Sequence, residues 1–466
     1  MGGEPLSFPA RLFCYTFSMS VFQKISSSLR EDPLFKRVLN SSLHLFSSNT
    51  ISVGLSVLQG MLVYRLLGPA GSGLVRVVMS YASTINSIFS FRMSELVVRY
   101  GGEYIERGEK NKASALIKSA SMTEGIVSAL AFLVVILTAG LAEQYVAKTP
   151  NTTFLFIIFS LGLLANFNTE TSTGILQVTS KIKLQGTINL IQSIVTTLII
   201  VAAFIWNGSL EIILIAYLVS KTLIGLGMFI AAQVQIHRLL GRGWWKEPFS
   251  SLSNARELVH FAVSSNVSAT IIKIFRESEP VWVGFFLSTE AVGYYGVAYQ
   301  IVGFLSIPAD PLISSVYPEL NRLTVQKAWS RLKDFLRKVT SLALAYNLVL
   351  ALGLVLFGNW AIIILGGKEY LPAYPAMIAL LIGLTFNYIL FWNRPLLLSL
   401  GQPTFPIRVT LIVGLIKIAL AFVFVPRYGI VAAGALLSFY YIASVGVMAW
   451  RGVQIINTQP QQERGL

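Results

Sequence analysis

Charged and polar side chains recur along one long apolar segment, residues 261–286, which reads FAVSSNVSATIIKIFRESEPVWVGFF. Asn266, Thr270, Lys273 and Glu277 follow one another at intervals of three or four residues, the spacing of one helix face. Ionisable groups are costly inside a bilayer and usually serve a function there. We therefore expect this face to line a water-filled cavity. Two more ionisable residues stand beside it, Arg276 and Glu279.

Other cations also lie within apolar segments. Arg92, Glu95 and Arg99 share a helix face, and two interpretations are open: a structural ion pair with Arg99 reaching the interface, or a ligand role. Lys221 and Lys417 fall near the middle of their segments, too deep to reach the membrane surface easily. That depth favours a role in substrate binding or coupling.

The balance of deep charges favours an anionic ligand. Basic groups outnumber the acids Glu277 and Glu279, and such an excess suits a phosphate or diphosphate. The two acids are candidates for carrying a coupling proton or cation. The predicted contacts to the phosphate headgroup are Arg92, Lys273, Arg276, Lys221 and Lys417.

Several other polar residues have simpler interpretations. Glu124, Glu170 and Asp310 are expected to be structural, and Arg65 and Arg76, which flank a tight turn, are expected to anchor helix ends at the membrane interface. One further group either binds a sugar by stacking and hydrogen bonding or forms an interfacial aromatic belt: Asn387, Tyr388, Trp392 and Asn393.

The composition indicates that these residues are positioned by membrane-spanning helices. The chain is 54% hydrophobic and only 12% charged, whereas soluble domains carry about 25% charged residues. A helix crosses the hydrocarbon with about 20 apolar residues. Twelve segments qualify: 43–66, 77–98, 120–141, 154–175, 188–205, 210–230, 261–286, 292–316, 339–357, 376–398, 409–425 and 430–450.

The same layout occurs twice, about 220 positions apart. Gly293 in VGFFLSTEAVGYY corresponds to Gly73 in VYRLLGPAGSGLV, and Gly429 corresponds to Gly208. This repeat predicts an all-α polytopic transporter of two pseudo-symmetric lobes, each with six spans. Pro280 and its repeat partner Gly60 are predicted to interrupt their helices, and paired interruptions point to a transporter's binding region.

Basic residues gather in alternate loops, so the positive-inside rule places both termini in the cytoplasm. The opposite loops carry little beyond Arg76, Lys148, Lys368 and Arg427. Short basic loops facing anionic lipid account for the net charge of +15 without nucleic acid. The single cysteine, Cys14, and the scattered histidines His44, His237 and His260 indicate neither a disulfide nor a metal site.

The expected domain organisation follows from the spans. It comprises a cytoplasmic N-terminal segment (1–40), an N-terminal bundle (41–232), a cytoplasmic linker (233–256), a C-terminal bundle (257–451) and a cytoplasmic tail (452–466). We treat residues 1–18 as a dispensable extension, a hypothesis that a terminal peptide beginning at Met1 in the natural protein would contradict.

Three runs carry a resemblance to a known family: VYRLLGPAGSGLVRV, VGFFLSTEAVGYYGVAYQI and YPELNRLTVQKAWSRLKDFLRKV. From about Met19 onward the chain resembles the polysaccharide transporter branch of the multidrug/oligosaccharidyl-lipid/polysaccharide superfamily. The resemblance implies a V-shaped pair of six-helix bundles around a central cavity. It further implies a plasma-membrane flippase that moves a polyprenyl-phosphate-linked oligosaccharide to the outer leaflet by alternating access. It also implies membrane lipids and glycan-assembly enzymes as partners. No cofactor is expected, and H⁺ or Na⁺ coupling is open.

Two other classes are weighed against a flippase. A multidrug-extrusion antiporter would share the two-bundle plan but should have an acidic cavity, and drug resistance on expression would reveal it. A membrane-embedded glycan polymerase or ligase usually needs a sizeable outward loop, and the spans leave only short ones. Elongation of an accumulated lipid-linked unit would reveal that activity, and we expect that this protein is not an enzyme.

Overall fold

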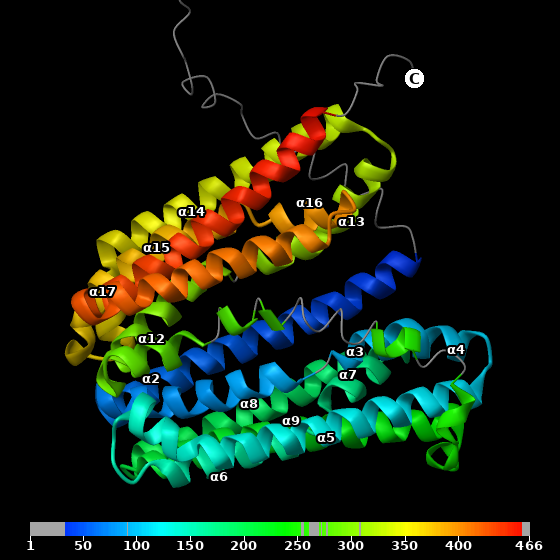
Figure 1. Ribbon diagram of the computed structural model, residues 1–466, viewed down its shortest axis with the longest axis horizontal. Helices are drawn as coiled ribbons and strands as arrows, with labels where there is room; N and C mark the ends of the chain where they lie inside the picture. Colours follow the sequence, from blue (N-terminus) through cyan, green and yellow to red (C-terminus); the bar gives the residue numbers. More distant parts are fainter. Residues whose placement is uncertain are drawn as a thin grey trace, which may run out of the picture.

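The computed structural model describes residues 33–90, 92–252, 256–260, 270–271, 273–275, 278–306 and 309–458. Every regular element in these ranges is a helix (Figure 1). Lipid offers the backbone no hydrogen-bond partner, whereas a helix satisfies its N–H and C=O groups internally. The predicted all-α class is confirmed.

The N-terminal lobe begins with α2 (Pro33–Phe89), which consists of two arms joined at Gly68. The φ of 64° at Gly68 lies in the left-handed region, which glycine adopts without strain. The rest of this lobe is α3 (Met93–Leu96), η1 (Val97–Gly101), α4 (Gly102–Glu106), α5 (Lys110–Ala142), η2 (Glu143–Ala147), α6 (Thr153–Ala165), α7 (Thr169–Val178), α8 (Ile182–Ile205) and α9 (Leu210–Leu240).

The C-terminal lobe repeats this plan. Its first hairpin is α11 (Glu279–Phe286) and α12 (Thr289–Gly303), and its last element, α17 (Thr404–Thr458), turns at Gly429, where φ is 62°. Between them lie η5 (Phe304–Ser306), α13 (Ala309–Val325), α14 (Trp329–Leu365), η6 (Lys368–Ala373), α15 (Tyr374–Ile389) and α16 (Asn393–Ser399). The connection between the lobes contains η3 (Trp244–Lys246) and η4 (Phe249–Ser251).

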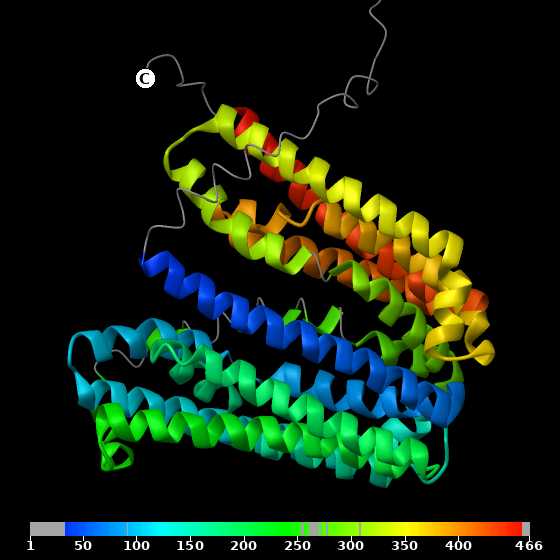
Figure 2. The same ribbon diagram turned by 180° about the vertical axis from the view of Figure 1, so that it is seen from behind.

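Eight helical stretches of the described chain are long and apolar enough to cross a membrane. Two of them, Ile51–Glu106 and Thr404–Thr458, contain the turns at Gly68 and Gly429 and therefore supply two crossings each. Within the described residues this gives the N-terminal lobe six crossings and the C-terminal lobe four, beside α11 and the α12–α13 pair, which occupy the places of its first two predicted segments. Figures 1 and 2 show the two bundles, blue to green and green to red.

Among the described residues, hydrophobic packing joins the lobes at one end. One core contains Val63 and Val77 of α2 together with Val292 and Ile301 of α12. Away from that end each lobe has its own core, one around Leu116 and the other around Leu332. The lobes therefore share apolar contacts where the hairpin turns of α2 and α11–α12 meet, and their other described cores are separate.

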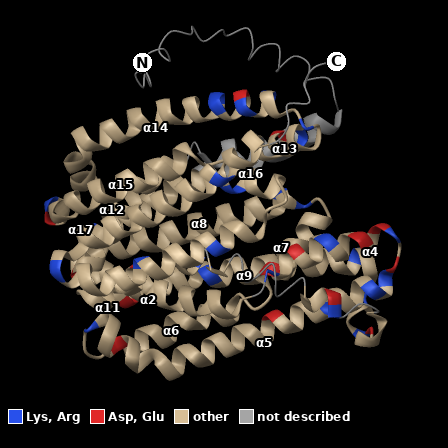
Figure 3. Cartoon of the chain, turned by 45° about the horizontal axis from the view of Figure 1, so that its top comes forward, with Lys and Arg blue, Asp and Glu red and all other residues tan. Residues whose placement is uncertain are grey.

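Charged side chains cluster at the end where the cores are separate. In Figure 3 they gather around α4, α13 and the start of α14, whereas the middle of the bundles is largely uncharged. The connection between the lobes lies on the N-terminal bundle at this end, since Trp244 is buried in that lobe's core and Lys118 of α5 donates to the Glu247 carbonyl (3.1 Å). Helix α9 continues to Leu240, so the first part of the predicted linker (233–256) is helical.

The prediction of paired helix interruptions is half wrong. Pro280 stands in the first turn of α11, where a proline is tolerated because its missing N–H would have no helical partner. Helix α2 runs through Gly60 without a break. Gly60 instead leaves room for the facing helix, because a Cβ there would lie 2.7 Å from Nε2 of Gln300.

Candidate functional site

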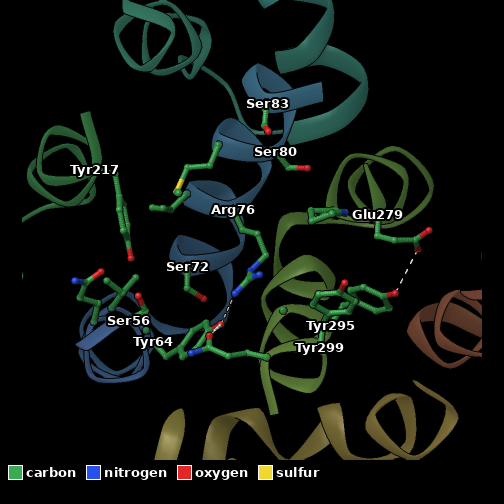
Figure 4. Close-up of a pocket in the computed structure, with 18 of the residues that line it drawn as sticks. Ser56, Tyr64, Ser72, Arg76, Ser80, Ser83, Tyr217, Glu279, Tyr295 and Tyr299 are labelled. Carbon is green, nitrogen blue, oxygen red and sulfur yellow. Dashed lines mark hydrogen bonds between the residues drawn. The ribbon is translucent and has the colours of Figure 1, made fainter. Parts of the chain in front are cut away.

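A cavity of about 460 Å³ lies between the two lobes. Helix α2 forms one wall and α12 with the start of α11 the other, and α6 and α9 complete it. Figure 4 shows the polar side chains around this space. They include Ser56, Gln59, Tyr64, Ser72, Arg76, Ser80, Ser83, Tyr217, Lys221, Glu279, Tyr295, Tyr299 and Gln300.

The side chain of Arg76 extends into the centre of Figure 4. Its Nη2 donates to the Tyr64 hydroxyl oxygen (2.5 Å), and that hydroxyl donates to Oε1 of Gln300 (2.8 Å). Gly296 of α12 faces the guanidinium, and a Cβ at Gly296 would collide with it. The absence of a side chain at Gly296 therefore leaves room for the Arg76 guanidinium. The network that the guanidinium joins consists of the neutral side chains of Tyr64 and Gln300.

The interfacial role predicted for Arg76 is wrong, because its side chain points between the lobes. Sequence reasoning missed it because Arg76 is close to a turn in linear sequence. A signal was available: Ser72, Arg76, Ser80 and Ser83 recur at intervals of three or four residues and form one polar helix face.

Lys221 and Lys273 both line cavities of the structure, and their predicted contact with a phosphate headgroup stays a prediction. Lys221 of α9 lines the central cavity and also a second chamber of about 200 Å³, which Lys273 lines as well. The second chamber opens from the same wall, because Met79, Ser83 and Phe159 border both spaces. Its lining also contains two carboxylates, those of Glu124 and Glu170.

Glu124 has a structural function. Its side chain is buried and accepts from the backbone N–H groups of Glu170 (2.8 Å) and Thr171 (2.9 Å), and from the Thr171 hydroxyl (2.8 Å). These are the first donors of α7, which have no partner within the helix. Glu170 accepts from the Ser94 hydroxyl (2.5 Å) and so ties α7 to α3.

Lys417 does not line the central cavity. It forms an ion pair with Glu279, and each side chain in the pair is only 5% exposed. Lys417 also donates to the carbonyl of Phe275 (3.3 Å), and the Tyr295 hydroxyl donates to Glu279 (3.3 Å). The predicted contact with a substrate headgroup is corrected: a buried charge must be paired, and Glu279 supplies the partner.

The other predicted contacts are placed as follows. Arg92 stands in the break between α2 and α3 and pairs with Glu95 (2.6 Å) on an exposed surface, the structural alternative left open above. Arg276 and Glu277 lie outside the described residues. In the tenth segment, Trp392 is buried and donates to the Thr340 hydroxyl (2.7 Å), so it holds α16 against α14.

The charge of the central cavity follows from these contacts. Of its charged lining residues Arg76, Lys221 and Glu279, the acid is neutralised by Lys417, which leaves a net positive lining. In the described part of the chain, no three His, Cys, Asp or Glu residues group closely enough to hold a metal ion. The site is therefore a polar, basic space between two lobes.

Comparison with known proteins supports this architecture. The polysaccharide biosynthesis protein family matches residues 38–324, more than half of the chain. The chain is 24% identical over 347 residues to the inner membrane protein YghQ of Escherichia coli (strain K12), covering 74% of this chain and 96% of YghQ.

Solved structures share the fold. An inward-facing multidrug resistance MATE family transporter of the MOP superfamily superposes with a TM-score of 0.71 at 13% identity, covering 89% of this chain and 96% of that one. The lipid II flippase MurJ, in an inward closed conformation, gives a TM-score of 0.65 at 15% identity, covering 89% and 91%. The predicted resemblance is confirmed, and the chain belongs to the polysaccharide biosynthesis protein family.

Proposed function

We propose that this protein is a flippase that carries a polyprenyl-phosphate-linked oligosaccharide from the cytoplasmic to the outer leaflet of the plasma membrane by alternating access. A polar glycan cannot cross about 30 Å of hydrocarbon unaided. A polar cavity between two lobes offers the headgroup a path, while the lipid tail stays in the bilayer.

The observation that carries the proposal is the placement of Arg76. Its guanidinium lies in the interlobe cavity and contacts neutral groups, the hydroxyl of Tyr64 foremost. A guanidinium can bind phosphate oxygens through two parallel hydrogen bonds. In this proposal Arg76 binds the phosphate, Lys221 and Lys273 guide it from the second chamber, and the serine and tyrosine hydroxyls of the wall contact the sugars.

The Lys417–Glu279 ion pair has no net charge, which supports the same preference for an anionic cargo. Because Glu279 already has an internal cation, the cavity does not present an unpaired acid for a cationic cargo at this position. A coupling role for Glu277 and Glu279 stays a prediction.

The test is the sidedness of lipid-linked oligosaccharide in cells depleted of the protein. A membrane-impermeant glycan probe reports the outer leaflet, and total lipid extraction reports the whole pool. We expect cytoplasmic accumulation that wild type reverses, Arg76→Lys partly reverses and Arg76→Gln does not. Arg92→Gln, which changes an exposed cation outside the cavity, is the matched control and should behave as wild type. An unchanged leaflet distribution on depletion would refute the proposal.

A multidrug antiporter is the second candidate, since the MATE transporter shares the fold over most of the chain. It predicts increased resistance to cationic drugs on expression and no effect on glycan sidedness. A polymerase or ligase would instead lengthen the accumulated glycan unit in vitro.

A further inference from the structure

Two basic side chains of the N-terminal lobe reach across to the C-terminal lobe at the end where the lobes share a core. Nη2 of Arg65 donates to the Ile364 carbonyl (2.7 Å), and Nζ of Lys148 donates to the carbonyls of Phe285 (2.7 Å) and Leu287 (3.0 Å). These carbonyls lie at the C-terminal ends of α14 and α11. The last carbonyls of a helix lack helical partners and carry partial negative charge, so a cation is stabilised there.

The two contacts are related by the internal repeat. Phe285 stands 220 positions after Arg65, and Lys368 stands 220 positions after Lys148, within the turn that follows Ile364. Each contact therefore joins the first hairpin of one lobe to the third crossing of the other. The two contacts are therefore equivalent under the pseudo-twofold relation between the lobes.

Two glycines at this end, Gly73 and Gly293, are related by the same offset of 220 positions. A Cβ at Gly73 would collide with the carbonyl of Thr289, and a Cβ at Gly293 would collide with the carbonyl of Pro69. Gly293 and Thr289 stand 220 positions after Gly73 and Pro69. The hairpin turns of the two lobes thus meet backbone to backbone, which a larger side chain would prevent.

We propose that Arg65 and Lys148 are paired latches that hold this end of the molecule closed, on either side of the glycine contact, and that both are released when the lobes open there. Both side chains are exposed, and their carbonyl acceptors can exchange them for water. The contact can therefore break without leaving a buried charge, unlike the Lys417–Glu279 pair. The latches act on the conformation and do not depend on which cargo is carried.

The test is the distance between the lobes at this end, measured by pulsed electron paramagnetic resonance on the full chain in lipid nanodiscs. Trp206 (79% exposed) and Tyr428 (64% exposed) lie at this end in opposite lobes. Both are replaced by cysteine to carry the spin labels, and Cys14→Ser removes the single native thiol. We expect the double variant Arg65→Gln/Lys148→Gln to raise the ratio of long to short distances by about tenfold, as loss of charge-assisted hydrogen bonds implies. Each single variant should give part of this change.

Lys368→Gln is the matched control. It removes an exposed lysine of the same end, the repeat partner of Lys148, for which the described residues provide no hydrogen bond or ion pair. An unchanged distance distribution in the double variant, or an equal change with Lys368→Gln, would overturn the proposal. Because the measurement needs no glycan, its outcome is independent of the proposed cargo.

A second variant tests the glycine contact between the latches. Gly73→Ala should exclude the closed arrangement and give mainly long distances. Gly54→Ala, in the same helix but with open space around it, should leave the distribution unchanged. A closed, correctly folded Gly73→Ala protein would contradict the role given to this contact.

Discussion

Arg76 and Lys417 are both deep cations, but their surroundings are opposite. Arg76 extends into the space between the lobes and donates to the neutral hydroxyl of Tyr64. Lys417 is buried within one lobe, with Glu279 as its ion-pair partner. The comparison teaches that a cation inside the membrane is available to a ligand only where the fold leaves its charge without an internal acid. Position in the sequence suggests the opposite ranking, because Lys417 falls in the middle of an apolar segment and Arg76 lies beside a turn.

The largest stability effect should follow the loss of the buried cation. Lys417→Met leaves the Glu279 carboxylate buried without its partner, so we expect a loss of about 3–5 kcal/mol in the free energy of unfolding. Thermal unfolding in detergent, followed by tryptophan fluorescence, measures it. The double variant Lys417→Met/Glu279→Gln should recover much of the loss. If the single variant is as stable as wild type, the pair is not a buried structural element.

Arg76→Gln should show the reverse pattern. Removing a guanidinium that points into a cavity strands no buried acid, so unfolding should change little. Phosphate binding should weaken by about tenfold or more, the cost of a lost charge-assisted hydrogen bond. Flipping of the lipid-linked glycan, compared with thermal unfolding of the same sample, separates the two effects. A variant that flips at the wild-type rate would exclude Arg76 as the phosphate contact.

Glu124 tests how hydrogen-bond donors stabilise a buried carboxylate. Glu124→Ala leaves the first N–H groups of α7 without their acceptor, and we expect a loss of about 1–3 kcal/mol in stability. Glu124→Gln keeps one acceptor oxygen and should cost less. The same thermal measurement applies, and equal stability of all three proteins would show that the cap is dispensable.

Arg92→Gln should have the smallest effect. Its ion pair with Glu95 is about half exposed on both sides, and such surface pairs contribute about 0–1 kcal/mol. Stability and flipping should both stay near wild type. A loss of flipping with normal stability would restore the ligand role that its sequence position left open.

Much of the candidate site was predictable, but its centre was not. Lys221 and Lys273 were identified as cavity residues because an ionisable group in an apolar segment has few other uses. Lys417 satisfied the same criterion, yet its acid partner lies 138 positions away in another helix. Arg76 was assigned to the interface because it follows a turn, although its side chain points inward.

The repeat gave a further lesson. Gly73 and Gly293 were aligned from the sequence, and the structure brings each against the other's hairpin. Gly60 was expected to interrupt a helix because Pro280 is its repeat partner. Its actual effect is to admit the Gln300 side chain, a contact between residues of different lobes that no local pattern contains.

The sequence by itself determined the medium, the all-helical class, the repeat and the two bundles. These follow from apolar length, helical period and internal similarity, which are properties of neighbouring residues or of the chain compared with itself. Only the tertiary structure decided which deep charges face the cavity, which neutralise each other and which cations donate to carbonyls of the other lobe. Those outcomes depend on the packing of distant helices, because the free energy of a charge is set by the groups that surround it in space.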